Sequence, residues 1–156
     1  MKLVKQQLYE KFSEDSDPIR DMGIGAKPLI LKWIENYKKS SRVYTNQSEF
    51  IINDDGTIDV EGNVNLYKIG LKQLPEYIQF NTVSGIFWIN QNQLITLKGC
   101  PYHVGQHFFC CNNMLTTLEF SPKKVVGAFD CTDNLVKFSI KDVLKVCDTN
   151  PNYIEC

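Results

Sequence analysis

The sequence has no excess of charge of either sign, because 17 Lys and Arg residues stand against 18 Asp and Glu residues, for a net charge of −1. It therefore offers no general positive field for a nucleic-acid backbone, and we expect no nucleic-acid partner. It also lacks the run of about 18 apolar residues that a transmembrane helix requires. Residues 1–7 (MKLVKQQ) lack the apolar stretch of a secretory signal. We expect a cytoplasmic protein that does not enter a membrane.

Motifs of common catalytic chemistry are missing too. The sequence contains no Gly-rich phosphate loop, no dinucleotide fingerprint and no metal-binding His-Glu motif. It has only two histidines, and no nucleophile turn accompanies them. Six cysteines would suggest disulfides in a secreted chain, but without a signal, and with Cys110 and Cys111 adjacent, reduced thiols are expected. We predict a protein that is not an enzyme and uses no cofactor.

What the sequence does have is a composition suited to one folded domain, with 156 residues of which 43% are hydrophobic. Its second half repeats with a period of 21 residues. The period is visible in Val83, Val104 and Val125, in Phe87, Phe108 and Phe129, in Asn92, Asn113 and Asn134, and in Leu94 and Leu115. A degenerate copy precedes these units, with apolar residues at Val64, Leu66, Leu71 and Leu74 and with Ile69 where Asn would stand.

The repeated residues predict a strand followed by a corner. The Phe and the residue two positions later point to one face of a strand, and we interpret that face as buried. The Asn amide is suited to bonding backbone groups where the strand ends. Stacked units would therefore carry an asparagine ladder of Asn92, Asn113 and Asn134. Asn112, one residue before the repeated position, is expected to lie outside the ladder and to tolerate replacement.

The unit, read as Phe-x-[Ile/Cys]-x-x-Asn-x-Leu-x-x-Leu, resembles the leucine-rich repeat. The resemblance extends over residues 64 to 138, although Phe replaces the first strand Leu and Leu135 arrives one residue early after Asn134. It implies an α/β fold: a short leucine-rich-repeat-like solenoid of about four coils with a short parallel sheet. It also implies a protein-interaction module.

Residues 94–101 (LITLKGCP) and 129–134 (FDCTDN) look more narrowly like short leucine-rich-repeat proteins encoded by tailed phages and some bacteria. This resemblance implies a partner protein of the host cell, with a defence component as one class. Residues 11–25 are similar to leaders of large-phage proteins. The alternative hypothesis is therefore a protein packaged in a phage particle, with a targeting leader at its N-terminus.

The flanking segments predict caps for the repeat array. We divide the chain into a leader (1–25), a helix and β-hairpin cap (26–62), the coils (63–138) and a C-terminal cap (139–156). Pro28 and apolar residues at helical spacing up to Tyr37 predict the first helix. Asp55-Gly56 between apolar runs predicts the hairpin. Ser139, with Asp142 three residues later, predicts the start of the last helix.

Strand alternation places a second set of side chains on the outer face of the predicted strands. The candidate partner-binding residues there are Tyr67, Ile86, Trp88, His107, Phe109 and Asp130. Cys111 is also expected to face outward and to react quickly with a thiol reagent. Trp88 beside Phe109 would make an exposed aromatic patch, which is typical of an interface. The alternative is that the leader folds over these residues.

One cluster predicts a different activity. Cys100, His103, His107 and Cys110 have spacings of three and four residues, which occur in zinc sites. A small zinc-binding module is therefore a second alternative. However, Cys110 occupies the inward position that is filled by Ile89 and Cys131 in the neighbouring units, which favours a role in packing.

Overall fold

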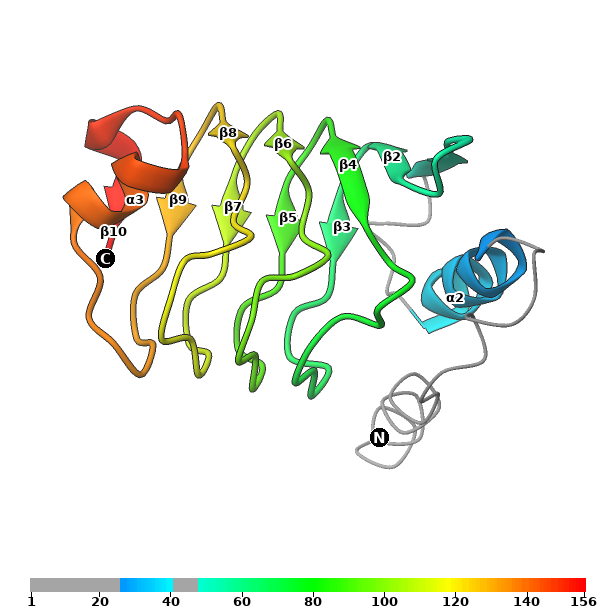
Figure 1. Ribbon diagram of the computed structural model, residues 1–156, viewed down its shortest axis with the longest axis horizontal. Coiled ribbons are helices and arrows are strands. Elements are labelled where there is room, and N and C mark those ends of the chain that lie inside the picture. Colours follow the sequence, from blue (N-terminus) through cyan, green and yellow to red (C-terminus); the bar gives the residue numbers. More distant parts are fainter. Residues whose placement is uncertain (1–25, 41–47) are drawn as a thin grey trace.

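The computed structural model describes residues 26–40 and 48–156 (Figure 1). This part of the chain is α/β, with the helices α2 (Lys27–Ser40) and α3 (Ile140–Val146) and two five-stranded sheets. Neither helix is long and apolar enough to cross a membrane. The predicted leader, residues 1–25, lies outside the described residues.

The hairpin prediction is confirmed. Strands β1 (Glu49–Ile52) and β2 (Ile58–Glu61) pair antiparallel, with Ile52 opposite Ile58. The turn between them contains Gly56 at a φ of 82°, a left-handed conformation that glycine adopts at little cost. The hairpin begins the first sheet, and every later strand pair in both sheets is parallel.

The repeat units supply most of the remaining strands. These are β3 (Val64–Asn65), β4 (Phe80–Val83), β5 (Phe87–Trp88), β6 (His103–Val104), β7 (Phe108–Phe109), β8 (Lys124–Val125), β9 (Phe129–Asp130) and β10 (Ile154–Glu155). Sheet A has the order β1-β2-β4-β6-β8, and sheet B has the order β10-β9-β7-β5-β3. The 21-residue offset persists in the register, since Phe87 pairs with Phe108 and Phe108 with Phe129.

The sequence predicts one short parallel sheet, whereas the structure has two. Each unit bends between its Val and its Phe, so that β4 joins sheet A and β5 joins sheet B (Figure 1). Glycine stands at these bends because the backbones of successive units approach closely. A Cβ on Gly85 would lie 2.6 Å from the carbonyl oxygen of Gly62, and one on Gly127 would lie 2.7 Å from that of Gln106.

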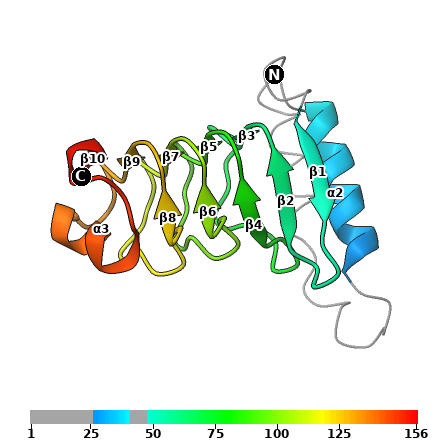
Figure 2. The same cartoon turned by 90° about the horizontal axis from the view of Figure 1, so that it is seen from above.

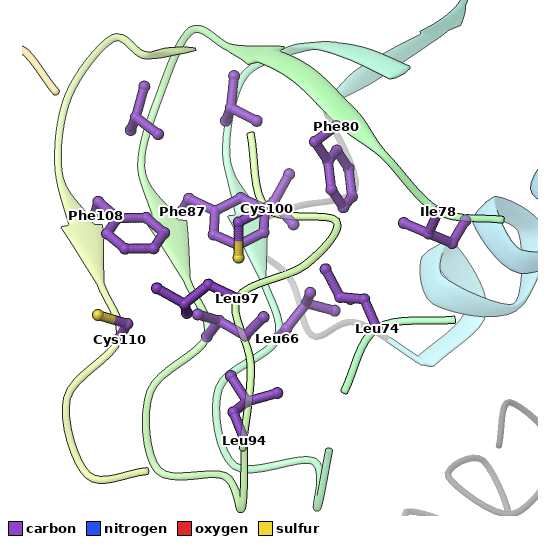
Figure 3. Close-up of a cluster of buried hydrophobic side chains, with 14 of the residues drawn as sticks. Leu66, Leu74, Ile78, Phe80, Phe87, Leu94, Leu97, Cys100, Phe108 and Cys110 are labelled. Carbon is purple, nitrogen blue, oxygen red and sulfur yellow. The ribbon is translucent and has the colours of Figure 1, made fainter. Parts of the chain in front are cut away.

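The core runs along the length of the stack. The inward strand positions repeat from unit to unit, and Phe87, Phe108 and Phe129 are fully buried. The ring centroids of Phe87 and Phe108 are 6.0 Å apart, and those of Phe108 and Phe129 are 5.1 Å apart. Phe80 adds a further ring 5.3 Å from that of Phe87. Leucines from the opposite side of each unit complete the interior (Figure 3). A unit on its own would leave this surface in water, so its stability depends on its neighbours.

Helix α2 covers the N-terminal end of the stack (Figure 2). Its buried face includes Ile30, Trp33 and Tyr37, at the helical spacing that the sequence predicts. The Trp33 ring lies 6.0 Å from that of Phe80, which joins the helix to the core. The hydroxyl of Tyr37 accepts a hydrogen bond from the Asn65 amide at 2.8 Å. This contact satisfies a donor on the edge strand of sheet B.

The C-terminal segment covers the other end (Figure 2). Ser139 and Asp142 form the predicted capping box of α3. The chain then returns, and β10 pairs in parallel with β9 at the edge of sheet B. The Asp148 carbonyl accepts from the Val125 amide, and the Asp148 amide donates to the Lys123 carbonyl. Both sheets are therefore covered at this end.

The three repeated asparagines tie neighbouring units together. The Asn92 Oδ1 accepts from three consecutive amides, Ile69 to Leu71, at 2.9–3.1 Å. The buried Asn113 accepts from the Leu94 amide and donates to carbonyls of its own unit and of the preceding one, at Cys110, Cys111 and Ile89. Asn134 repeats the pattern toward Leu115 and Cys110. Each amide therefore bridges two units.

The expectation that Asn112 tolerates replacement, as by alanine, does not take account of its backbone conformation. Its backbone has a φ of 54°, and Lys68, Gln91 and Asp133 occupy the equivalent left-handed position in the other units. Asn adopts this conformation more readily than most residues, whereas Ala is strained there. Asn112 thus stabilises the corner through its backbone rather than through the amide ladder.

We predict that Asn113→Ala lowers the free energy of unfolding by about 1–3 kcal/mol, because buried backbone donors and acceptors of two units lose their partner. Denaturant unfolding, followed by circular dichroism, measures the change. Gln93→Ala, at an exposed position of the preceding corner next to Leu94, is the control and is expected to change stability by less than about 0.5 kcal/mol. An unchanged unfolding midpoint for Asn113→Ala would contradict the ladder.

Candidate functional site

The outer face of sheet B carries most of the candidate residues that the sequence suggests. The register places five residues side by side across the strands, and we call them the central row: Asn65, Trp88, Phe109, Asp130 and Glu155. The residues that precede the first four along the strands are buried, Ile154 before Glu155 is partly buried, and the three central members are partly exposed. The alternation predicted for these strands is therefore present in the structure.

Two aromatic rings stack at the middle of the central row. The centroids of Trp88 and Phe109 are 6.4 Å apart, with 21° between the ring planes. The His107 ring lies 5.8 Å from that of Phe109. Stacking on one side leaves each ring partly exposed on the other, so the pair presents an ordered apolar surface.

His107 also has a structural role. Its Nδ1 accepts a hydrogen bond from the Ala128 amide at 2.9 Å. Between the first two units, the Asn63 Oδ1 accepts a hydrogen bond from the Ile86 amide at 2.8 Å in the same way. The side chains of Asn63 and His107 thus fix the bend of the following unit. The remaining ring nitrogen of His107 is left for other contacts.

The other candidates lie around the aromatic pair. Ile86, two residues before Trp88, is partly exposed, and Tyr67 is 40% exposed. The Tyr67 hydroxyl donates to Gln91 Oε1 at 3.0 Å, which holds the phenol ring against the next unit. Asp130 Oδ1 accepts from the amide and hydroxyl of Thr132 at 3.0 Å and 2.7 Å. These contacts give the carboxylate a fixed position next to Phe109 in the central row.

Glu155 is the residue of this face that the sequence reasoning missed. It lies on β10, which follows the short 3-10 helix Pro151–Tyr153 and pairs with β9 so that Glu155 stands opposite Asp130. The repeat period ends before this segment, so periodicity gave no signal for it. Asn150 followed by Pro151 marks a turn, but it does not indicate which strand the chain rejoins.

The expectation of an exposed Cys111 is wrong. Its side chain is buried, with 7% exposure, and burial raises the pKa of the thiol to about 11, with a hydrogen bond to Asp130 adding to the effect. The alternation stops here because the strand ends at Phe109 and the chain turns into the corner. Burial also raises the pKa of Cys131 to about 12 and that of Cys147 to about 11.

The zinc hypothesis is not supported by the geometry. Cys100 and Cys110 are buried among apolar side chains (Figure 3), whereas His103 is exposed on sheet A. The His107 Nδ1 is already engaged by a backbone amide. Within residues 26–40 and 48–156, no three His, Cys, Asp or Glu side chains are close enough to hold a metal ion. The four residues follow the repeat instead of converging on a site.

Two ideas from the sequence concern the leader, namely that it covers the strand face and that it targets the chain to a particle. Both fall on residues outside the described part of the chain. Comparison with known proteins adds no identity, since no family model, no curated protein and no solved structure matches the chain. The geometry of the sheet B face is therefore the basis for assigning a function.

We predict that Cys111 reacts with a thiol reagent on the order of 100-fold more slowly than Cys156 in the native protein at pH 8, because a raised pKa leaves little thiolate. Cys110, which is fully buried, is expected to be slower still. Rates at each site are measured by timed alkylation and peptide mass spectrometry. The denatured protein is the control, in which all six cysteines should react alike. Equal native rates for Cys111 and Cys156 would contradict the burial.

Proposed function

We propose that the chain is a non-enzymatic protein-interaction module that binds its partner through the outer face of sheet B. The observation that carries this proposal is the stacked Trp88–Phe109 pair in the central row. Partly exposed aromatic side chains with a fixed orientation lose little conformational entropy on binding, and they are enriched among the residues that dominate interface energies. Tyr67, Ile86, His107 and Asp130 surround this centre.

We further propose that the fold is a short leucine-rich-repeat-like solenoid. The in-register parallel pairing at a 21-residue offset supports this interpretation, as do the asparagines that bridge successive units. Solenoids bury a continuous core by stacking and present an extended strand surface to partners. The sheet B face would be that surface.

The repeats themselves allow a comparison between framework and surface positions. At the inward position the units carry Val64, Phe87, Phe108 and Phe129, all apolar and all fully buried. At the next position along the chain, the same units carry the chemically different residues of the central row. The fold therefore constrains the first set and not the second. Solvation alone gives no reason for Trp and Phe at adjacent outward positions, whereas a binding surface does.

The partner we propose is a protein of a bacterial host, bound in the host cytoplasm, with the chain encoded by a tailed phage. This part of the proposal rests on the resemblance of residues 94–101 and 129–134 to short repeat proteins of phages. A defence protein of the host is the partner class that this origin favours.

The test is affinity capture from bacterial lysate with the wild-type protein and with the double variant Trp88→Ala, Phe109→Ala. We predict that the double variant retains its fold, with a loss of about 1–3 kcal/mol for two partly buried stacked rings, and loses the captured protein. Thermal unfolding and quantitative mass spectrometry of the bound fraction measure the two effects.

Two controls make this test specific. Phe108→Ala removes a fully buried ring and should cost about 3–5 kcal/mol, which shows how a core substitution behaves. Tyr102→Ala removes an exposed aromatic ring just before β6 of sheet A and should leave both stability and capture unchanged. A folded double variant that captures the same protein as the wild type would refute the proposed surface.

A further inference from the structure

The central row changes its chemistry along the stack. Its N-terminal half holds the stacked rings of Trp88 and Phe109, and its C-terminal half holds two carboxylates, Asp130 and Glu155, on paired positions of β9 and β10. Neighbouring strands are about 4.8 Å apart, so the carboxylates begin one strand spacing beyond the Phe109 ring. The row contains no Lys or Arg to neutralise them.

The two carboxylates differ in how firmly they are held. Asp130 is partly buried, and its Oδ1 accepts two hydrogen bonds from Thr132, so its position is set before any partner arrives. Glu155 is exposed on the last strand of the sheet. Two like charges at paired positions of adjacent strands repel each other, and a cation bound between them would relieve that repulsion.

The stacked rings of Trp88 and Phe109 indicate which kind of cation would fit next to the two carboxylates. A long basic side chain can lay its aliphatic stem on an aromatic surface while its charged head reaches a carboxylate. The distance from Phe109 to the two carboxylates is one to two strand spacings, about 5–10 Å, which such a side chain can span. A guanidinium also stacks on aromatic rings and pairs with carboxylates through two parallel hydrogen bonds, whereas an ammonium acts as a point charge.

We propose, building on the interaction surface proposed above, that the partner presents an arginine to this face, with its stem on Phe109, next to Trp88, and its guanidinium between Asp130 and Glu155. The proposal specifies the partner as a basic segment with an exposed arginine. It also makes β10 part of the binding surface, since the cap contributes one of the two carboxylates.

The first experiment uses defined peptides and the two tryptophans of the chain. The indole N–H of Trp88 reports on the face, and that of the buried Trp33 serves as an internal control. The peptide acetyl-Ala-Arg-Ala-Arg-Ala-amide is expected to shift the Trp88 signal in NMR titrations and to leave that of Trp33 in place. The same peptide with citrulline, which has the shape of arginine without its charge, is expected to bind at least about tenfold more weakly.

Variants of the two carboxylates then test whether these side chains contact the arginine. Glu155→Gln changes an exposed side chain, so it should retain the native fold, and we expect it to weaken arginine-peptide binding by about fivefold or more. Asp130→Asn should do the same if its thermal unfolding matches the wild type. Glu119→Gln, an exposed carboxylate outside sheet B, is the matched control and should have no effect. Equal binding of the arginine and citrulline peptides, or wild-type affinity in Glu155→Gln, would overturn the arginine site.

Capture of the partner separates this inference from the proposal on which it rests. Loss of capture in both the aromatic double variant and Glu155→Gln supports both. Loss in the double variant with wild-type capture in Glu155→Gln keeps the interaction surface and refutes the arginine. Capture that survives in the folded double variant refutes the surface, and the arginine contact fails with it.

Discussion

Each unit of this protein has polar backbone groups that it cannot satisfy by itself, and the rest of the structure depends on that requirement. The corner after each strand turns the chain so sharply that its amides and carbonyls lack a regular partner. The asparagine of the next unit supplies it, as Asn92 does for Ile69 to Leu71. The ladder therefore fixes the register of the stack. It also explains Ile69 in the first copy, which has no regular unit before it to bridge.

A stack held together in this way has two open ends, and the chain closes them by different means. At the N-terminal end, α2 covers the core with Trp33 and satisfies a strand amide through the Tyr37 hydroxyl. At the C-terminal end, β10 extends sheet B and Asp148 bonds the edge of sheet A. Unpaired strand edges invite association with other chains, and these contacts satisfy part of the polar backbone groups at the two ends.

The sequence predicts well whatever the period determines. The buried Phe and Leu positions, the asparagine corner, the hairpin and the Ser139 cap follow from spacing and local chemistry. Three features do not. Cys111 is buried because the strand ends before it. Asn112 adopts a left-handed backbone conformation. Strand β10 pairs with β9 through a contact between segments that are distant in the sequence. The first and third depend on where an element stops or returns, which no periodic pattern encodes. The left-handed position does recur, but it is filled by Lys68, Gln91, Asn112 and Asp133, so no repeated residue type marks it.

The last of these features determines the chemistry of the outer face. If the array simply ended at β9, the central row would end on Asp130, and one carboxylate would stand at the edge of sheet B. The strand that caps the sheet brings Glu155 beside it instead. The same strand, β10, therefore both covers the end of sheet B and supplies a side chain to its outer face. Within β10, Ile154 packs against the core, whereas the exposed Glu155 is free of the packing constraint that fixes the inward positions. Glu155 is therefore a position where this fold can change its surface chemistry without disturbing the core.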